Sequence, residues 1–128
     1  MTSAAQVTVA GDGRVSVTMG SVDLSGTRTT MAQVAAEEFD IPLSDVSVVM
    51  GDTKSAGYSD AAAGSRVGRT MAAAVSEACK DALGQLRRRA AEKLQSNPDA
   101  VSYAAGVFRT EGAPGAAINL FDLMRATL

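Results

Sequence analysis

The chain has 128 residues, of which 46% are hydrophobic, 20% charged and only 4% aromatic. These values are typical of one globular domain with a modest core of aliphatic residues, methionine and alanine, and we expect residues 1–128 to form a single domain. The net charge of −2 provides no positive field for nucleic acid and no polybasic membrane anchor.

The residue types that are missing exclude several classes of protein. The chain has no histidine and one cysteine, Cys79, so we expect no zinc, haem or iron–sulfur site of its own side chains and no serine or cysteine hydrolase triad. No stretch approaches the roughly 18 apolar residues of a membrane span, and residues 1–3 do not begin a signal peptide. The sequence therefore predicts a cytoplasmic protein that contacts no membrane and no nucleic acid.

The N-terminal part of the chain predicts two strands, a helix and a third strand. Valine and methionine alternate with polar residues on both sides of residues 11–13, which is typical of a β-hairpin with one buried face. A helical period begins near Thr27 and should end before Pro42, because the residue before a proline avoids the α conformation. The β-branched run 46–50 is typical of a buried strand.

The rest of the chain predicts a long helix, a second hairpin and a short final helix. Apolar residues recur at helical spacing along one face, which comprises Val67, Met71, Val75, Ala78, Ala82, Leu86 and Leu94. Cys79 lies one position beyond Ala78 and is expected to be a small buried residue rather than a reactive thiol. Residues 101–109 predict a hairpin, and residues 117–119 an edge strand that leads into a last helix.

This order of elements indicates the fold class. Two strands, a helix, a strand and a long helix are followed by a small hairpin and a C-terminal helix. We expect an α+β domain of two layers, in which a mixed β-sheet is covered on one face by two main helices.

Two loops place glycine, a hydroxyl residue and arginine at the start of a helix. At such positions the backbone N–H groups and the helix dipole attract anions, and glycine lets a ligand approach the backbone. The sequence therefore predicts a site for a phosphate-bearing ligand. The candidate residues are Ser25, Gly26, Thr27 and Arg28 in the first loop and Gly64, Ser65 and Arg66 in the second. The alternative is that the hydroxyl residues are ordinary helix caps and the two arginines are solvated.

Residues 20–75 carry a resemblance to a known family. They contain, in order, the segments VDL, TRT, AQVAAE, IP, GDT and GSR. Together these resemble the molybdopterin-binding large subunit of the xanthine dehydrogenase and aldehyde oxidase family, in whose bacterial members the two loops typically read D-I-G-Q-G-T-x-T and G-S-R followed by Ser or Thr. The resemblance extends more weakly to residues 103–109, and it implies that the chain is one internal cofactor-binding domain of such a subunit.

The resemblance also implies a reaction, a cofactor and partners. The full-length protein would be a molybdenum hydroxylase that oxidises purines, aldehydes or related heterocycles. Its cofactor would be molybdopterin, in the mononucleotide or the cytosine dinucleotide form, with iron–sulfur clusters and FAD carried only by partner subunits or domains. The remaining domains of the same large subunit would be further partners. The family's general base, a glutamate in a downstream G-x-G-E segment, has no counterpart here, so we expect the isolated chain to be inactive.

The first loop departs from the family pattern. Ser25 and Gly26 stand where the family has G-Q-G, so the loop is one residue shorter and lacks the glutamine beside the metal. Three explanations are open: the loop approaches the metal differently through the Ser25 hydroxyl, the subfamily acts on a different substrate, or molybdenum is not bound. Two other functions are open as well, a free-standing module that binds a phosphorylated small molecule or a protein partner, and a structural domain whose loops have drifted.

Overall fold

The elements follow one another in the predicted order. The computed structural model describes residues 4–23, 26–51, 54, 56, 67–112 and 115–127. Its elements are β1 (Ala5–Val9), β2 (Val15–Met19), α1 (Thr27–Phe39), β3 (Val46–Met50), α2 (Ala72–Lys93), β4 (Val101–Ala104), β5 (Val107–Thr110), β6 (Ala117–Asn119) and α3 (Leu120–Thr127). A π-helical turn, Val67–Met71, leads directly into α2. The predicted α+β class is confirmed.

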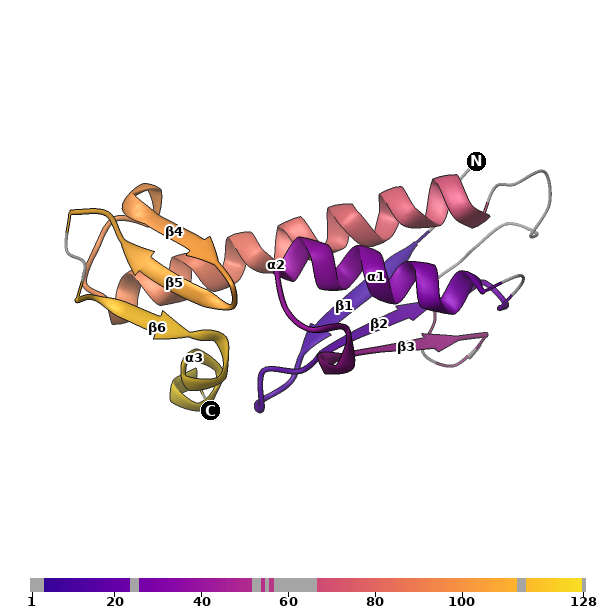
Figure 1. Cartoon of the computed structure of the whole chain (residues 1–128), viewed down its shortest axis with the longest axis horizontal. Coiled ribbons are helices and arrows are strands. Elements are labelled where there is room, and N and C mark those ends of the chain that lie inside the picture. Colours follow the sequence, from indigo (N-terminus) through magenta and orange to yellow (C-terminus); the bar gives the residue numbers. More distant parts are fainter. Residues whose placement is uncertain are drawn as a thin grey trace.

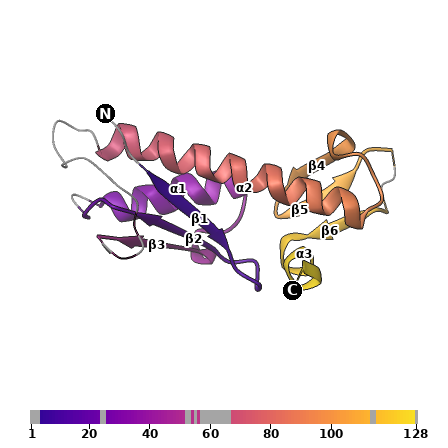
Figure 2. The same cartoon turned by 180° about the vertical axis from the view of Figure 1, so that it is seen from behind.

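The first sheet has the order β1-β2-β3 and mixes two kinds of pairing. β1 and β2 form the antiparallel hairpin that the alternating pattern predicts, whereas β2 and β3 are parallel, with Val17 opposite Val48. A parallel pair needs a crossover, and α1 provides it. α1 lies over β2 and β3, and α2 lies beside α1 and over β1, so both helices cover the same face of the sheet (Figures 1 and 2). Val15, Val17 and Met19 of β2 are fully buried beneath them.

The second sheet stands at the far end of α2. The predicted hairpin and edge strand form an antiparallel sheet of their own, in the order β4-β5-β6, and α3 follows β6 directly. The side chain of Asn119 caps α3, since its Oδ1 accepts a hydrogen bond of 2.7 Å from the backbone N–H of Asp122. α2 runs along both sheets and joins them (Figure 1).

The buried face of α2 differs from the predicted face: Ala78, Ala82 and Leu94 are only partly buried, and Ala90 and Ala91 are buried although they were not predicted. Met71, Val75 and Leu86 are buried as expected, but Ala78 is only half-buried, and Cys79, with 0% of its surface exposed, takes its place in the core. Residues 71, 75 and 79 follow one another at intervals of four, so they lie on one face. Burial, and to a smaller extent the nearby carboxylate of Glu38, raises the pKa of the Cys79 thiol to about 12. The expectation that Cys79 is buried is confirmed. That the thiol is unreactive stays a prediction.

The C-terminal end of α1 contacts the second sheet. The helix ends before Pro42 as predicted, but Asp40 ends it in the left-handed conformation, with φ of 49°. The N–H of Ile41 then bonds to the carbonyl of Ala36 at 3.1 Å and the N–H of Asp40 to that of Glu37 at 3.2 Å. This pair of bonds is the Schellman arrangement, in which the last carbonyls of a helix find donors.

Asp40 and its neighbour Phe39 hold the hairpin of the second sheet. The Asp40 carboxylate accepts a hydrogen bond of 2.6 Å from the N–H of Ala105, in the tight turn between β4 and β5. The Tyr103 hydroxyl donates to the carbonyl of Phe39. Burial, and secondarily the charge of Asp40, raises the pKa of Tyr103 to about 12, so the hydroxyl remains a donor at neutral pH.

We predict that Tyr103→Phe destabilises the chain by about 1–2 kcal/mol, because the Phe39 carbonyl loses its donor in a partly buried place. Chemical denaturation measures the free energy of unfolding. Ser102→Ala is the matched control on the same strand, since its hydroxyl makes only an exposed contact of 3.4 Å to the Arg109 carbonyl. Equal losses in the two variants would contradict a special role for Tyr103.

We also predict that two glycine-to-alanine changes act in opposite directions. Gly84 lies inside α2 with no atom within 4 Å of an added Cβ, so Gly84→Ala should stabilise the chain by roughly 0.5–1 kcal/mol. Gly13 has a φ of 81°, and its Cβ would stand 3.3 Å from the backbone of Phe121, so Gly13→Ala should destabilise it. Thermal unfolding of both variants tests this, and a shift in the same direction for both would refute it.

Candidate functional site

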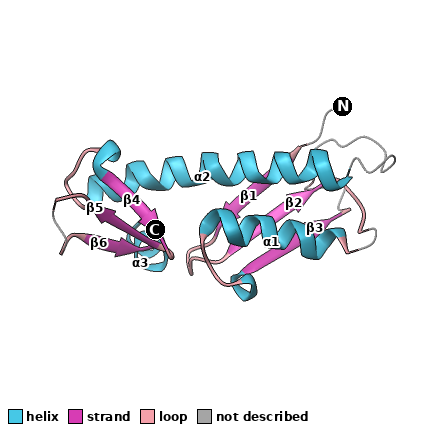
Figure 3. Cartoon of the chain, turned by 45° about the horizontal axis from the view of Figure 1, so that its top comes forward, coloured by secondary structure: helices cyan, strands magenta, loops and turns pink. Residues whose placement is uncertain are grey.

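Parallel pairing brings the ends of two strands and the starts of two helices to one edge. β2 and β3 are parallel, so both end at the same edge of the sheet. α1 begins beyond the end of β2, and the turn Val67–Met71 that opens α2 lies against α1. We call this side of the molecule the carboxyl edge (Figure 3). Ligands of α/β sheets commonly bind outside the carboxyl ends of parallel strands.

Four of the seven predicted site residues lie outside the described residues. They are Ser25, Gly64, Ser65 and Arg66. The structure places the other three, Gly26, Thr27 and Arg28, at the N-terminus of α1 and therefore at the carboxyl edge.

Gly26 has the backbone conformation that glycine best permits. It precedes α1 with φ of 77° and ψ of 21°, in the left-handed region. Its carbonyl accepts hydrogen bonds from the N–H of Thr30 at 3.1 Å and from the Thr30 hydroxyl at 3.3 Å. Apart from its chain neighbours, no described residue has an atom within 4 Å of where a Cβ would stand. The first turn of α1 carries no acidic side chain, but the carboxylate of Asp23, in the loop before the helix, accepts from the backbone of this turn.

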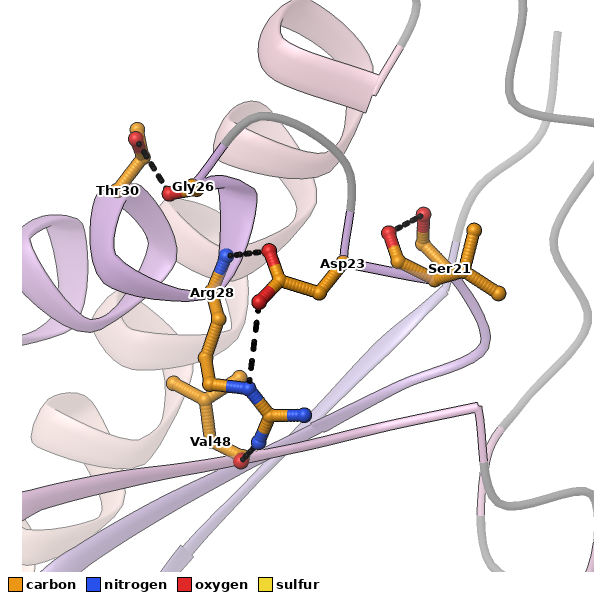
Figure 4. A network of polar contacts seen from close by, with 7 residues as sticks. Ser21, Asp23, Gly26, Arg28, Thr30 and Val48 are labelled. Atoms are coloured by element: carbon orange, nitrogen blue, oxygen red, sulfur yellow. Dashed lines mark hydrogen bonds and ion pairs between the residues drawn. The ribbon is translucent and has the colours of Figure 1, made fainter.

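Arg28 is engaged within the protein. Its backbone N–H donates to Asp23 Oδ1 at 3.1 Å, its Nε lies 3.7 Å from Asp23 Oδ2, and one terminal nitrogen donates to the Val48 carbonyl at 2.6 Å (Figure 4). Arg28 is thus both partly solvated, with half of its side chain exposed, and bonded to its neighbours. Sequence reasoning missed Asp23 as a partner, because Asp23 stands five residues before Arg28 and outside the N-cap position, which Gly26 occupies.

The turn that opens α2 contributes a cation to the carboxyl edge. Val67–Met71 forms a π-helical turn, a rare geometry that often occurs at functional sites. Met71 is fully buried and anchors the turn, while Arg69 is exposed. Val22, between β2 and α1, is 53% exposed, so the same edge also offers apolar surface.

Comparison with known proteins identifies the family. A family model described as a molybdopterin cofactor-binding domain matches residues 1–127. The chain belongs to that family. It is 34% identical, over 101 residues, to a subunit of nicotinate dehydrogenase from Pseudomonas putida, a match that covers 78% of this chain and 8% of that protein. It is 32% identical, over 124 residues, to the gamma subunit of the 6-hydroxypseudooxynicotine dehydrogenase complex of Paenarthrobacter nicotinovorans, covering 94% of this chain and 15% of that protein.

Solved structures of larger chains contain the same fold. CO dehydrogenase from Oligotropha carboxidovorans matches 99% of this chain with a TM-score of 0.91 at 28% identity. Quinoline 2-oxidoreductase from Pseudomonas putida 86 matches 97% of it with a TM-score of 0.86 at 26% identity. The chain spans 16% of each of those chains. The resemblance to the xanthine dehydrogenase family is thus confirmed, and the chain is a molybdopterin cofactor-binding domain of the molybdenum hydroxylase type.

The start of α1 and the turn before α2 carry both signs of charge. Among the described residues Gly26 has open space beside it and Arg69 is exposed, whereas the Asp23 carboxylate accepts from the Arg28 backbone and pairs with the Arg28 side chain. The described residues contain no group of three or more His, Cys, Asp or Glu side chains that could hold a metal ion. The described helices include none that is long and apolar enough to cross a membrane.

We predict that Gly26→Ala destabilises the chain by about 1–2 kcal/mol, because an L-residue is strained at a φ of 77°. Gly26→Asn should cost less, since asparagine tolerates this conformation better. Gly68→Ala is the control: Gly68 also has open space around it but does not have a positive φ. Chemical denaturation measures the three variants, and an unchanged stability for Gly26→Ala would refute the argument from strain.

Proposed function

We propose that this domain uses its carboxyl edge to bind the phosphate or dinucleotide tail of molybdopterin within a larger hydroxylase subunit. The observation that supports this most directly is the meeting of two helix starts at one edge of the sheet in a chain of the molybdopterin-binding family. Each helix start directs backbone N–H groups and a positive dipole end outward. Two of them together suit the negative charges of a phosphate or a pyrophosphate.

Six of the seven candidate residues have a proposed role at the phosphate that their chemistry supports. Gly26 and Gly64 would let the tail approach the backbone, and the hydroxyls of Ser25, Thr27 and Ser65 would donate hydrogen bonds to phosphate oxygens. Arg66 would supply a positive charge. When bound, the cofactor supplies the redox chemistry by which the complete enzyme oxidises purines, aldehydes or related heterocycles. The residues of this chain bind and orient it.

The relatives support a division of labour between this domain and the rest of the enzyme. They are named for nicotinate, 6-hydroxypseudooxynicotine, quinoline and CO, although all share this domain. A domain shared by enzymes that are named for such different compounds is better suited to hold the cofactor than to select the substrate. We propose that substrate selection and the catalytic glutamate reside in other domains of the same subunit, that iron–sulfur and FAD partners accept the electrons, and that the assembly is cytoplasmic.

We predict that cytidine diphosphate and inorganic pyrophosphate bind the isolated chain at the carboxyl edge. In an NMR titration, the amide signals of residues 26–30 and 67–71 should shift, and binding should weaken as salt is added because the interaction is largely electrostatic. Arg66→Ala should weaken binding, whereas Arg109→Ala, on β5 of the second sheet, should not. The uncharged nucleoside cytidine is the ligand control.

Two results would count against this function. Absence of shifts with both phosphates, or equal shifts with cytidine, would contradict an anion site at the carboxyl edge. Metal analysis of the same sample should detect no stoichiometric molybdenum, because the proposed site takes only the tail of the cofactor. Stoichiometric molybdenum in the purified chain would contradict the proposal that other domains complete the site.

A further inference from the structure

The polar contacts of Asp23 and Arg28 connect three separate elements. Asp23 follows the end of β2, Arg28 is the second residue of α1, and Val48 belongs to β3. One carboxylate oxygen of Asp23 accepts from the Arg28 backbone at 3.1 Å, and the other lies 3.7 Å from the Arg28 side chain. The guanidinium reaches on to the Val48 carbonyl at 2.6 Å (Figure 4). The pair therefore connects the start of α1 to β3 and to the loop that follows β2.

These contacts leave Arg28 poorly suited to bind a phosphate directly. Its charge is balanced by Asp23, and its guanidinium is turned toward the strand, as Figure 4 shows. A phosphate that approached the Arg28 guanidinium would meet the Asp23 carboxylate 3.7 Å from its Nε, and the repulsion between the two anions opposes a direct contact. Gly26, two residues earlier, is by contrast open to a ligand.

We propose that Asp23 and Arg28 form a clip that positions the start of α1 for the cofactor tail, and that Arg28 is a positioning residue and not a ligand of the phosphate. The clip is defined by three residues, Asp23, Arg28 and Val48. This role rests on the proposed function, because the tail is what the positioned backbone would bind. It replaces the direct contact that the loop motif alone suggests for Arg28.

Whether Asp23→Ala strengthens or weakens anion binding distinguishes a clip from a direct contact between Arg28 and the phosphate. If Arg28 were a ligand and Asp23 only a nearby negative charge, Asp23→Ala would strengthen the binding of an anion. If the two residues form a clip, Asp23→Ala weakens binding as Arg28→Ala does. Arg28→Lys is informative as well, because lysine keeps the charge but lacks the planar fork that reaches two acceptors at once.

The experiment titrates the chain and its variants with cytidine diphosphate and follows binding by NMR. We expect Asp23→Ala, Arg28→Ala and Arg28→Lys each to weaken binding by a similar factor, roughly 2- to 30-fold. The double variant Asp23→Ala/Arg28→Ala should bind no more weakly than either single variant, because one unit is removed in each case. Asp12→Ala and Arg14→Ala are the controls, since they remove an ion pair of the same kind from the β1–β2 turn, and both should bind as the unchanged chain does.

Amide hydrogen exchange provides a second readout that needs no ligand. Loss of the clip should speed the exchange of the backbone amides at positions 28 and 30 in Asp23→Ala and in Arg28→Ala. The exchange rates in the core of α2 should stay unchanged. Stronger binding by Asp23→Ala, unchanged binding by Arg28→Lys or unchanged exchange at the start of α1 would each overturn the clip. If the unchanged chain binds no cytidine diphosphate, the proposed function fails, and the exchange rates alone then decide whether the clip exists.

Discussion

The parallel pairing of β2 with β3 is the constraint on which the rest of the structure depends. Parallel strands cannot be joined by a tight turn, so the chain must cross over one face of the sheet, and α1 makes that crossing. The crossing sets the start of α1 at the carboxyl edge and its end beside the second sheet. α2 then packs beside α1 on the same face and extends beyond the first sheet. Both the candidate site and the joint between the sheets follow from this one pairing.

Much of the fold is predictable from the sequence because its signals are local. Alternating valines indicate the first hairpin, the helical periods indicate α1 and α2, and Asn119 marks the start of α3. Contacts between residues far apart in the chain have no such local signal. Nothing near Asp40 in the sequence indicates that its carboxylate caps the N–H of Ala105. The burial of Cys79 in place of Ala78 also depends on residues far away in the chain, since the elements packed against α2 decide which of its sides is buried.

Gly26, Thr27 and Arg28 lie at the start of a helix as the sequence predicts, but the contacts of Arg28 were not predictable. Glycine before a helix indicated an open backbone, and Gly26 has the left-handed conformation that makes glycine useful there. The same motif suggested that Arg28 faces a ligand, whereas it pairs with Asp23 and reaches Val48. An arginine in a loop motif can bind a ligand or hold the loop, and its sequence neighbours are the same in both cases. Only the position of β3 distinguishes them.

The Asp23–Arg28 pair also bears on how a chain of net charge −2 could attract an anionic cofactor. The overall field of such a protein opposes a phosphate, so attraction has to come from groups close to it. Backbone N–H groups at helix starts act over short distances and are little affected by charges elsewhere. The Asp23 carboxylate bonds to the first turn of α1, and Arg28 balances its charge while both hold the helix start in place. Positioning and charge balance are therefore served by the same contact, which is why a lysine that preserves the charge alone is not expected to replace Arg28.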